Sequence, residues 1–203
     1  MVRIAVTGGI ACGKSRLALY LQSCHIPILE ADEVAHIALA QGTNVYKDVV
    51  SEFGIVILDA SGGINRSKLA DIVFGNEAKL DKLNSFVHPI VKREIDNWLE
   101  AEEKKGETQV VAIIPLLYES GMDCGWDAII AVGCFAEIQR ERLMKRGLNE
   151  TLCRQIIASQ MSVEEKMKNS EFTIWNNEDE VSFEKKIDNV LKTIQERQYG
   201  RRE

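Results

Sequence analysis

The stretch VRIAVTGGIACGKS at residues 2–15 joins a short apolar run to a glycine-rich loop. Its second half, Gly8 to Ser15, satisfies the pattern G-x-x-x-x-G-K-[ST], and the helix-forming run SRLALYLQSC begins within it. A strand before the loop and a helix after it are the context that this phosphate-binding motif requires. The context therefore favours a nucleotide-binding loop over a glycine-rich turn that carries GKS by chance.

We expect this loop to bind ATP together with Mg²⁺. Glycines let the backbone N–H groups turn toward the phosphates, and the following helix adds its positive end. Lys14 would reach the β- and γ-phosphates, and the Ser15 hydroxyl would be the Mg²⁺ ligand. The expected nucleotide contacts are Gly8, Gly9, Ile10, Ala11, Cys12, Gly13, Lys14, Ser15 and Arg16.

Arg16 and Cys12 have unusual surroundings within this motif. Arg16 places a cation in the first helical turn, where it opposes the helix dipole unless an anion lies nearby, and bound triphosphate would be that anion. Cys12 lies near Lys14 at the positive end of the helix, which lowers the pKa of a thiol. Cys12 is then either an exposed, reactive thiol or a small residue whose sulfur faces inward, and the sequence favours neither reading.

Short runs rich in β-branched residues recur along the chain. They lie at residues 2–7, 108–114 and 127–132, and a further strand is expected shortly before Glu30. Such runs are typical of buried parallel strands, and segments of helical spacing separate them. We therefore predict an α/β fold, a P-loop NTPase core in which a parallel sheet is flanked by helices. Ligands bind such sheets beyond the carboxyl ends of the strands.

The rest of the chain has helical character. The segment 64–105 reads as helices interrupted at Gly75 and before Pro89, and we predict a helical insertion there. The last helix, about 182–197, has an apolar stripe of the kind that faces a core. The stripe consists of Phe183, Ile187, Val190, Leu191 and Ile194.

Three short helices are expected before the last one. The first begins near Ala136 and stops at Gly147, and the second starts after Asn149, a suitable N-cap. The third starts at Ser162, with Glu165 at capping-box spacing. Short, hinged helices of this kind suit a mobile lid.

Two carboxylates follow the expected second strand, in the sequence HIPILEADEVAH at residues 25–36. Glu30 and Asp32 would face the nucleotide from the end of that strand. Phosphoryl transfer needs a positioned nucleophile, so a carboxylate here can orient the hydroxyl of an acceptor. The alternative is that Asp32 caps a helix that starts at Glu33.

Composition limits the range of partners. The 203 residues carry a net charge of −6 and a pI near 5.3, which argues against a general nucleic-acid binder. We find no leader pattern and no apolar run long enough for a membrane span. The five cysteines include no C-x-x-C pair, which fits reduced thiols in a cytoplasm better than a disulfide framework or zinc site. We expect a cytoplasmic monomer or weak homo-oligomer.

A GTP-binding switch protein is a competing interpretation of the loop. It would carry D-x-x-G and N-K-x-D motifs. The nearest matches are D-A-S-G at residues 59–62 and A-K-L-D at residues 78–81. The second lacks the asparagine and lies in a helical pattern, so this interpretation is disfavoured.

Taken together, the motifs resemble those of the dephospho-CoA kinase family over roughly residues 4–177. Besides the loop and the E-A-D step, the landmarks are Gly63 to Arg66 with Leu69 and Phe74, His88-Pro89, Pro115 to Glu119, Arg142 to Arg146, Gln155 to Gln160, and Asn176-Asn177. The resemblance implies phosphorylation by ATP of the ribose 3′-hydroxyl of dephospho-CoA. A nucleoside or nucleoside-monophosphate kinase is the nearest alternative, and the helical insertion and the His88 and Pro115 landmarks favour the first.

The resemblance also implies an organisation into three parts. The nucleotide core would comprise residues of about 1–60, 106–135 and 170–203. The helical insertion that binds CoA would span about 61–105, and the lid about 136–169.

Residue roles follow from the same resemblance. Asp32 would act as base or orient the hydroxyl, Lys14 would clamp the phosphates, and Arg142 would act from the lid on the transferring phosphoryl group. Asn176 would contact the nucleotide. The acceptor site would contain His88, Leu116, Leu117 and Glu119.

Several of these roles have alternatives. His88 is equally suited to tie down a helix that Pro89 opens, and Leu116 and Leu117 read as strand-end core residues. A solvated basic face is the alternative for Arg142. The chain also departs from the family pattern, with Glu30 for the usual aspartate, Ala11-Cys12 for a Gly-Ser pair, and Arg16 for a hydroxyl residue.

Overall fold

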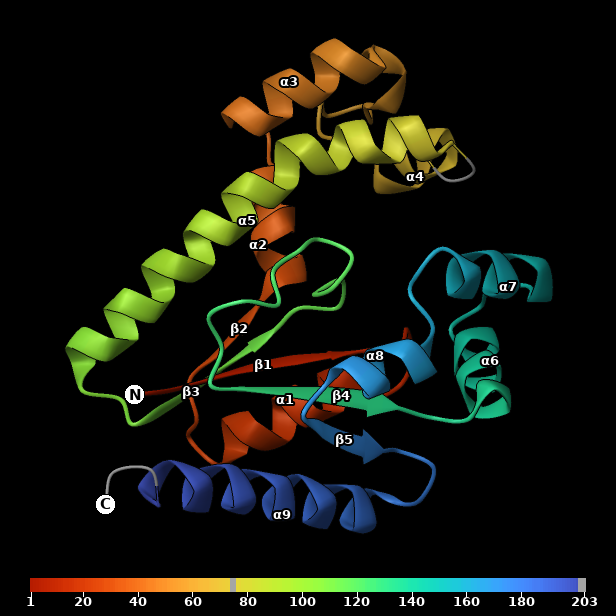
Figure 1. The fold of residues 1–203 in the computed structure, drawn as a ribbon. Coiled ribbons are helices and arrows are strands. Elements are labelled where there is room, and N and C mark those ends of the chain that lie inside the picture. Colours follow the sequence, from red (N-terminus) through yellow and green to blue (C-terminus); the bar gives the residue numbers. More distant parts are fainter. Residues whose placement is uncertain (74–75, 201–203) are drawn as a thin grey trace. The chain divides into compact units, whose positions relative to one another are not determined.

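The computed structural model describes residues 1–73 and 76–200, which form two compact units (Figure 1). One unit consists of residues 1–29 and the chain from Leu99 onward, and the other of Glu30–Trp98. Residues 30–60, which the sequence analysis assigned to the nucleotide core, are thus grouped with the helical segment. The expected break at Gly75 and the landmark Phe74 lie outside the described residues.

Within the described residues, five strands form one parallel sheet, which confirms the predicted fold class. The strand order is β2-β3-β1-β4-β5. The strands are β1 (Val2–Gly8), β2 (Ile28–Glu30), β3 (Gln109–Ile113), β4 (Ala128–Gly133) and β5 (Phe172–Trp175). The fifth strand was not predicted, because its four residues, FTIW, are too few for their pattern to distinguish a strand.

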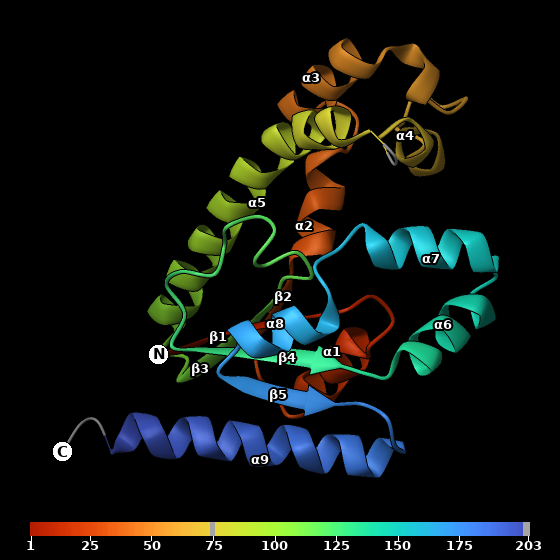
Figure 2. The same cartoon turned by 45° about the vertical axis from the view of Figure 1, so that its right-hand side comes forward.

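Helices cover both faces of this sheet (Figures 1 and 2). On one face lie α1 (Lys14–Ser23) and α9 (Glu180–Tyr199), whose predicted apolar stripe packs into the core as expected. On the other lies α8 (Val163–Asn169), which approaches the sheet closely at Gly133. A Cβ on Gly133 would lie 2.7 Å from Cγ1 of Val163, so glycine is required for this contact.

The lid segment forms as its capping signals predict. Helix α6 (Ala136–Lys145) ends before Gly147, whose φ is 88°. The Asn149 side chain caps α7 (Glu150–Ala158) by accepting from Leu152 N. Ser162 and Glu165 make the capping box at the start of α8.

The unit Glu30–Trp98 contains α2 (Ala31–Ala38), α3 (Asn44–Phe53), the 3₁₀ turn η1 (Ile55–Ile57), α4 (Arg66–Val73) and most of α5 (Glu77–Lys105). Helix α5 runs for 29 residues through Pro89, so the predicted interruption there is wrong. Proline removes one helical hydrogen bond, but four buried residues spaced four apart hold the helix on both sides of it. They are Val87, Val91, Ile95 and Leu99. No helix of the described ranges is both long and apolar enough to cross a membrane.

Pro89 interrupts the hydrogen bonding of a helix that forms regardless, so we predict that Pro89→Ala stabilises the protein. Proline is about 3 kcal/mol less favourable than alanine inside a helix, and local adjustment recovers part of this. We expect the free energy of unfolding in urea to rise by roughly 1 to 3 kcal/mol.

Lys92→Ala is the matched control, because Lys92 is exposed on the same helix. Its effect should stay within about 0.5 kcal/mol. A loss of stability in Pro89→Ala would mean that the ring itself makes contacts that the helix needs.

Candidate active site

The backbone of the loop between β1 and α1 is fixed by close contacts that only glycine permits. Gly8 has a φ of 142°, and a Cβ there would lie 2.0 Å from the carbonyl oxygen of Val132. Gly13 has a φ of 110°, and its Cβ would lie 2.1 Å from Nδ2 of Asn176. Both positions combine a left-handed backbone with no room for a side chain. The glycines of the motif are therefore needed for the path of the chain itself.

Three side chains, two from α6 and one from the segment after β5, hold the carbonyl groups of the loop. Gln139 Nε2 donates to Ile10 O at 2.8 Å. Arg142 Nη1 donates to Ala11 O at 3.2 Å, and Asn176 Nδ2 to Cys12 O at 2.9 Å. Three successive carbonyl groups are thus bound, which fixes the orientation of the peptide planes between them. A loop held in this way is suited to bind an anion through its N–H groups.

Lys14 and Ser15 begin helix α1, at its positive end. The ammonium group of Lys14 donates to the carbonyl oxygens of Gly8 (2.8 Å) and Gly9 (2.9 Å), so it lies over the start of the loop. Ser15 is exposed, and the first turn of α1 contains no acidic residue. The start of α1 therefore presents positive charge and an accessible hydroxyl, as a phosphate site requires.

An anionic side chain of the protein lies beside Arg16, which forms an ion pair with Glu180, the first residue of α9. The role expected of bound triphosphate, to offset the charge of Arg16, stays a prediction. The predicted contact of Arg16 with nucleotide stays a prediction.

Arg142 anchors the loop and is not part of a solvated face. Besides Ala11 O, it donates from Nη2 to Asn176 O at 3.1 Å, and its side chain is half-buried. By contrast, the neighbouring Lys145 is exposed and pairs with Glu141, as expected of a residue on a solvated basic face. The planar guanidinium group holds its donors in a fixed geometry and binds the two carbonyl groups through separate nitrogens. Action of Arg142 on a transferring phosphoryl group stays a prediction.

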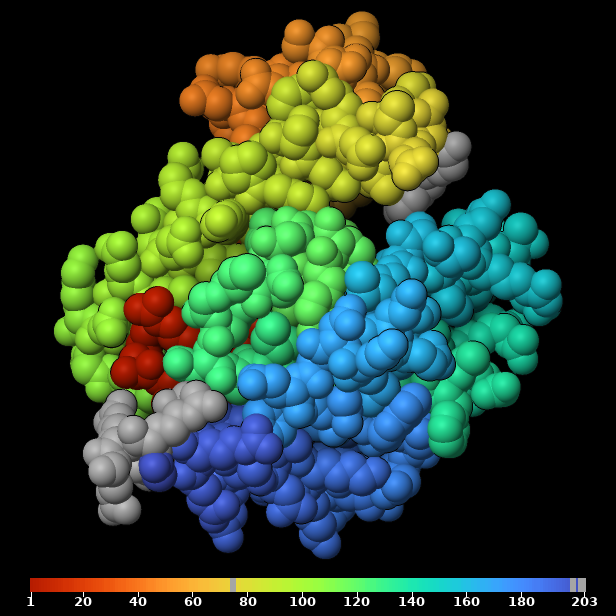
Figure 3. All heavy atoms as spheres, viewed as in Figure 1, coloured from red at the N-terminus to blue at the C-terminus, as the bar shows by residue number. Residues whose placement is uncertain are grey.

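A buried lysine that the sequence analysis missed connects α8 to the segment after β3. Lys166 is fully buried, donates to Pro115 O at 2.6 Å, and pairs with Glu119 Oε1 at 2.8 Å. Glu119 also accepts from Met161 N at 3.0 Å. In the space-filling view the light-blue α8 segment lies against the green segment after β3 (Figure 3). The one signal of this burial in the sequence is that Lys166 lies three residues after Val163, on the same face of the helix, and that Val163 is buried.

The residues expected at the acceptor site have different degrees of exposure. Leu117 is fully buried, as its alternative reading as a core residue requires, while Leu116 is half-buried. Glu119 keeps 23% of its side chain exposed. Among these residues, Glu119 and Leu116 have surface available to a ligand.

Asp32 and Glu30 belong to the unit Glu30–Trp98, where Asp32 does not have the capping role offered as its alternative. Helix α2 begins at Ala31, so Glu30 occupies the cap position, without a side-chain cap hydrogen bond. Asp32 lies inside the first turn and is exposed. Burial raises the pKa of the Glu30 carboxyl, and the nearby charges of Glu33 and Asp32 raise it further. Asp32 is the more exposed of the two side chains.

His88 lies inside α5 in the same unit. It is half-buried, and burial lowers its pKa, so the neutral imidazole is favoured. Because α5 continues through Pro89, His88 does not tie down a helix that starts there. Its predicted contact with the acceptor stays a prediction.

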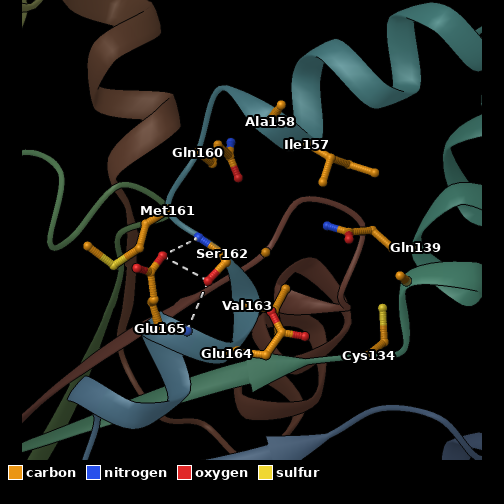
Figure 4. A pocket seen from close by; sticks show the side chains of 12 residues that line it. Cys134, Gln139, Ile157, Ala158, Gln160, Met161, Ser162, Val163, Glu164 and Glu165 are labelled. Carbon is orange, nitrogen blue, oxygen red and sulfur yellow. Dashed lines mark hydrogen bonds between the residues drawn. The ribbon is translucent and has the colours of Figure 1, made fainter.

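A pocket of about 390 Å³ adjoins the loop at Gly9. Its wall comes mainly from the lid segment, including Gln139, Ile157 and Val163 (Figure 4). The capping box of Ser162 and Glu165 lies at its edge. The pocket lies between the phosphate-binding loop and the segment that was predicted as a lid.

Comparison with known proteins gives one consistent family. The family model described as dephospho-CoA kinase matches residues 2–182. A dephospho-CoA kinase from Bdellovibrio bacteriovorus is 36% identical over 193 residues, which are 95% of this chain and 96% of that protein. One from Geobacillus kaustophilus is 40% identical over 175 residues, covering 86% and 87% of the two chains.

Solved structures agree with this result. TT1252 from Thermus thermophilus superposes with a TM-score of 0.80 at 29% identity, covering 97% of each chain. The dephospho-CoA kinase from Campylobacter jejuni has a TM-score of 0.67 at 27% identity, covering 95% of this chain and 96% of that one. A shikimate kinase from Bacteroides thetaiotaomicron, with a TM-score of 0.51 at 14% identity, shares the fold alone.

Lys166→Met should lower the free energy of unfolding by about 3 kcal/mol, because loss of one partner leaves a poorly solvated carboxylate and carbonyl unpaired. Adding Glu119→Gln to the same chain should restore part of the loss, since the uncompensated charge is then gone. Urea unfolding of the single and double variants measures both effects.

Lys145→Met is the matched control, because Lys145 makes an ion pair of similar length at the surface. It should cost less than about 1 kcal/mol. If Lys145→Met and Lys166→Met lower the free energy of unfolding equally, the ion pair of Lys166 stabilises the protein no more than a surface pair does.

Proposed function

The chain belongs to the dephospho-CoA kinase family, and we propose that it transfers the γ-phosphoryl group of ATP to the ribose 3′-hydroxyl of dephospho-CoA, giving CoA and ADP, the last step of coenzyme A biosynthesis. The match of the family model to residues 2–182 is the observation that carries the proposal. The geometry of the loop supports the nucleotide part of it, because Gly8, Gly13 and the bound carbonyl groups hold a phosphate cradle in place.

Phosphoryl transfer depends on position and on charge more than on covalent help from the protein. We assign the β- and γ-phosphates to the loop N–H groups and to Lys14, whose ammonium group already lies beside the loop. Arg142 would keep Ala11 in place while the phosphates bind. The developing charge would then meet fixed donors, which need no reorganisation during the reaction.

Mg²⁺ fits the residues present. No cluster of three or more His, Cys, Asp or Glu side chains occurs in the described part of the chain. A magnesium ion that is held largely by substrate phosphates needs no such cluster. The exposed Ser15 hydroxyl would hold the ion, whose charge offsets that of the phosphates.

Asp32 is proposed as the residue that orients the acceptor hydroxyl and accepts its proton. The side chain is exposed and does not cap its helix, which leaves it available for this role. Glu30 is a weaker candidate because burial and two neighbouring carboxylates raise its pKa. Glu119, Leu116 and His88 are proposed contacts of the acceptor.

We also propose that the protein acts in the cytoplasm as a monomer or weak homo-oligomer, without nucleic acid. The net charge of −6 supports the absence of a nucleic-acid partner. The odd number of cysteines, without a C-x-x-C pair, supports reduced thiols in a cytoplasm.

The proposal predicts that the purified protein, with Mg²⁺ and ATP, converts dephospho-CoA to CoA. A coupled assay of ADP release, with CoA identified by mass, is the measurement. Adenosine and common nucleoside monophosphates should give no comparable turnover. Preference for a monophosphate would instead make the chain a nucleoside-monophosphate kinase.

Asp32→Asn should lower kcat by at least about 100-fold, the lower range for a positioned general base. The affinity for ATP should stay the same, because the phosphate-binding loop is unchanged. Glu30→Ala is the comparison and should cost less. If the two effects come in the reverse order, the roles of the two carboxylates are exchanged.

A further inference from the structure

Two cysteines that lie far apart in the sequence are in contact beside the phosphate-binding loop. Cys12 belongs to the loop and Cys134 follows β4, and both are almost completely buried. Their sulfur atoms are 3.3 Å apart, with the Cys134 thiol donating to Cys12 Sγ. A disulfide has a sulfur separation of about 2.05 Å. The pair therefore needs to close by only roughly 1.2 Å to form one.

In this pair Cys134 is the hydrogen-bond donor and Cys12 is the acceptor. The hydrogen bond from Cys134 is the main cause that lowers the pKa of Cys12; burial opposes it, and Lys14 and Arg142 add smaller lowering contributions. The same hydrogen bond and burial raise the pKa of Cys134. Cys12 therefore has thiolate character and Cys134 stays a thiol, and a thiolate is the reactive form toward an oxidant.

Both sulfurs lie close to the pocket next to the loop. Cys134 lines that pocket, near Gln139 and Val163 (Figure 4). Gly9 lines it too, and the position of a Cβ on Gly9 is 2.9 Å from Cys12 Sγ. The side chains of Val163 and Gln139 also lie at this point, so Cys12 is covered, and a small oxidant would reach the pair from the pocket on the side of Cys134.

We propose that Cys12 and Cys134 are a modification site, at which a peroxide forms an intrachain disulfide that lowers nucleotide affinity. The Cys12 thiolate attacks the O–O bond, giving a sulfenic acid and hydroxide. Cys134 then attacks the sulfenic sulfur, giving the disulfide and water. In total two thiols lose two electrons and two protons to one peroxide, which becomes two waters.

The disulfide would act on the loop through the position of Cys12. The Cys12 carbonyl is held by Asn176, and its neighbour Ala11 is held by Arg142. A shift of the Cys12 side chain by about 1 Å strains these bonds. We expect a fall of roughly 10-fold in nucleotide affinity, the size expected when one hydrogen bond that positions the loop is weakened. This effect rests on the proposed function only in that the loop binds nucleotide.

The test uses the full chain, oxidised with a few equivalents of hydrogen peroxide and then treated with an alkylating reagent under denaturing conditions. Peptide mass analysis should find a fragment that joins Cys12 to Cys134. Affinity for a fluorescent ATP analogue, measured without acceptor, should fall and return after dithiothreitol. Since no acceptor is present, failure of the dephospho-CoA assay would not affect this result.

Cys134→Ala is the decisive variant and Cys24→Ser the matched control, because Cys24 is exposed and lies away from the loop in sequence. Peroxide should leave the affinity of Cys134→Ala close to that of its own reduced sample, while Cys24→Ser should behave as the unmodified chain does. A joined fragment without loss of affinity would overturn the effect on the loop. Loss of affinity in Cys134→Ala, or no joined fragment, would overturn the site.

Discussion

The site depends on a backbone that lies too close to its neighbours for any side chain. The loop approaches β4 at Gly8 and Asn176 at Gly13, with virtual Cβ distances of 2.0 and 2.1 Å. The contact at Gly8 is with another backbone, which cannot move aside as a flexible side chain can. The loop is thereby set on the ends of the sheet, and bonds from Gln139, Arg142 and Asn176 complete its orientation. The phosphate cradle is thus a product of sheet packing as much as of its own sequence.

Close approach to glycine also places α8 over the loop. Val163 reaches both Gly9 and Gly133, where a Cβ would lie within 2.7 Å of its methyl groups. At the next turn of the helix Lys166 enters the interior, where a charge is tolerated only with partners. Pro115 O and Glu119 supply them. The loop, helix α8 and the segment after β3 are therefore connected within their unit by the apolar contacts of Val163 and by the ion pair of Lys166, which lie on the same face of α8.

Most of the architecture could be predicted from periodicity, caps and one motif, because these features act over a few residues. The helix ends at Gly147, Asn149 and Ser162 are examples. The failures involve partners far away in the sequence. Pro89 was expected to end a helix that buried residues on both sides sustain, and the short β5 gains its place from β4. Burial of Lys166 and the inward orientation of Cys12 depend on Glu119 and Cys134, 47 and 122 positions away, and no local pattern contains that information.

The bonds from α6 to the loop also bear on how the lid can move. Two of the three carbonyl anchors, Gln139 and Arg142, are part of α6, so a swing that carried this helix outward would pull on Ile10 and Ala11. Helix α7 meets the loop through apolar side chains instead, in a cluster that includes Cys153 and Ala11. Gly147, with its left-handed backbone, lies between the two helices. Hydrogen bonds from α6 and apolar packing from α7 therefore both tie this segment to the loop, and separating α6 from the loop would cost the two bonds to Ile10 and Ala11.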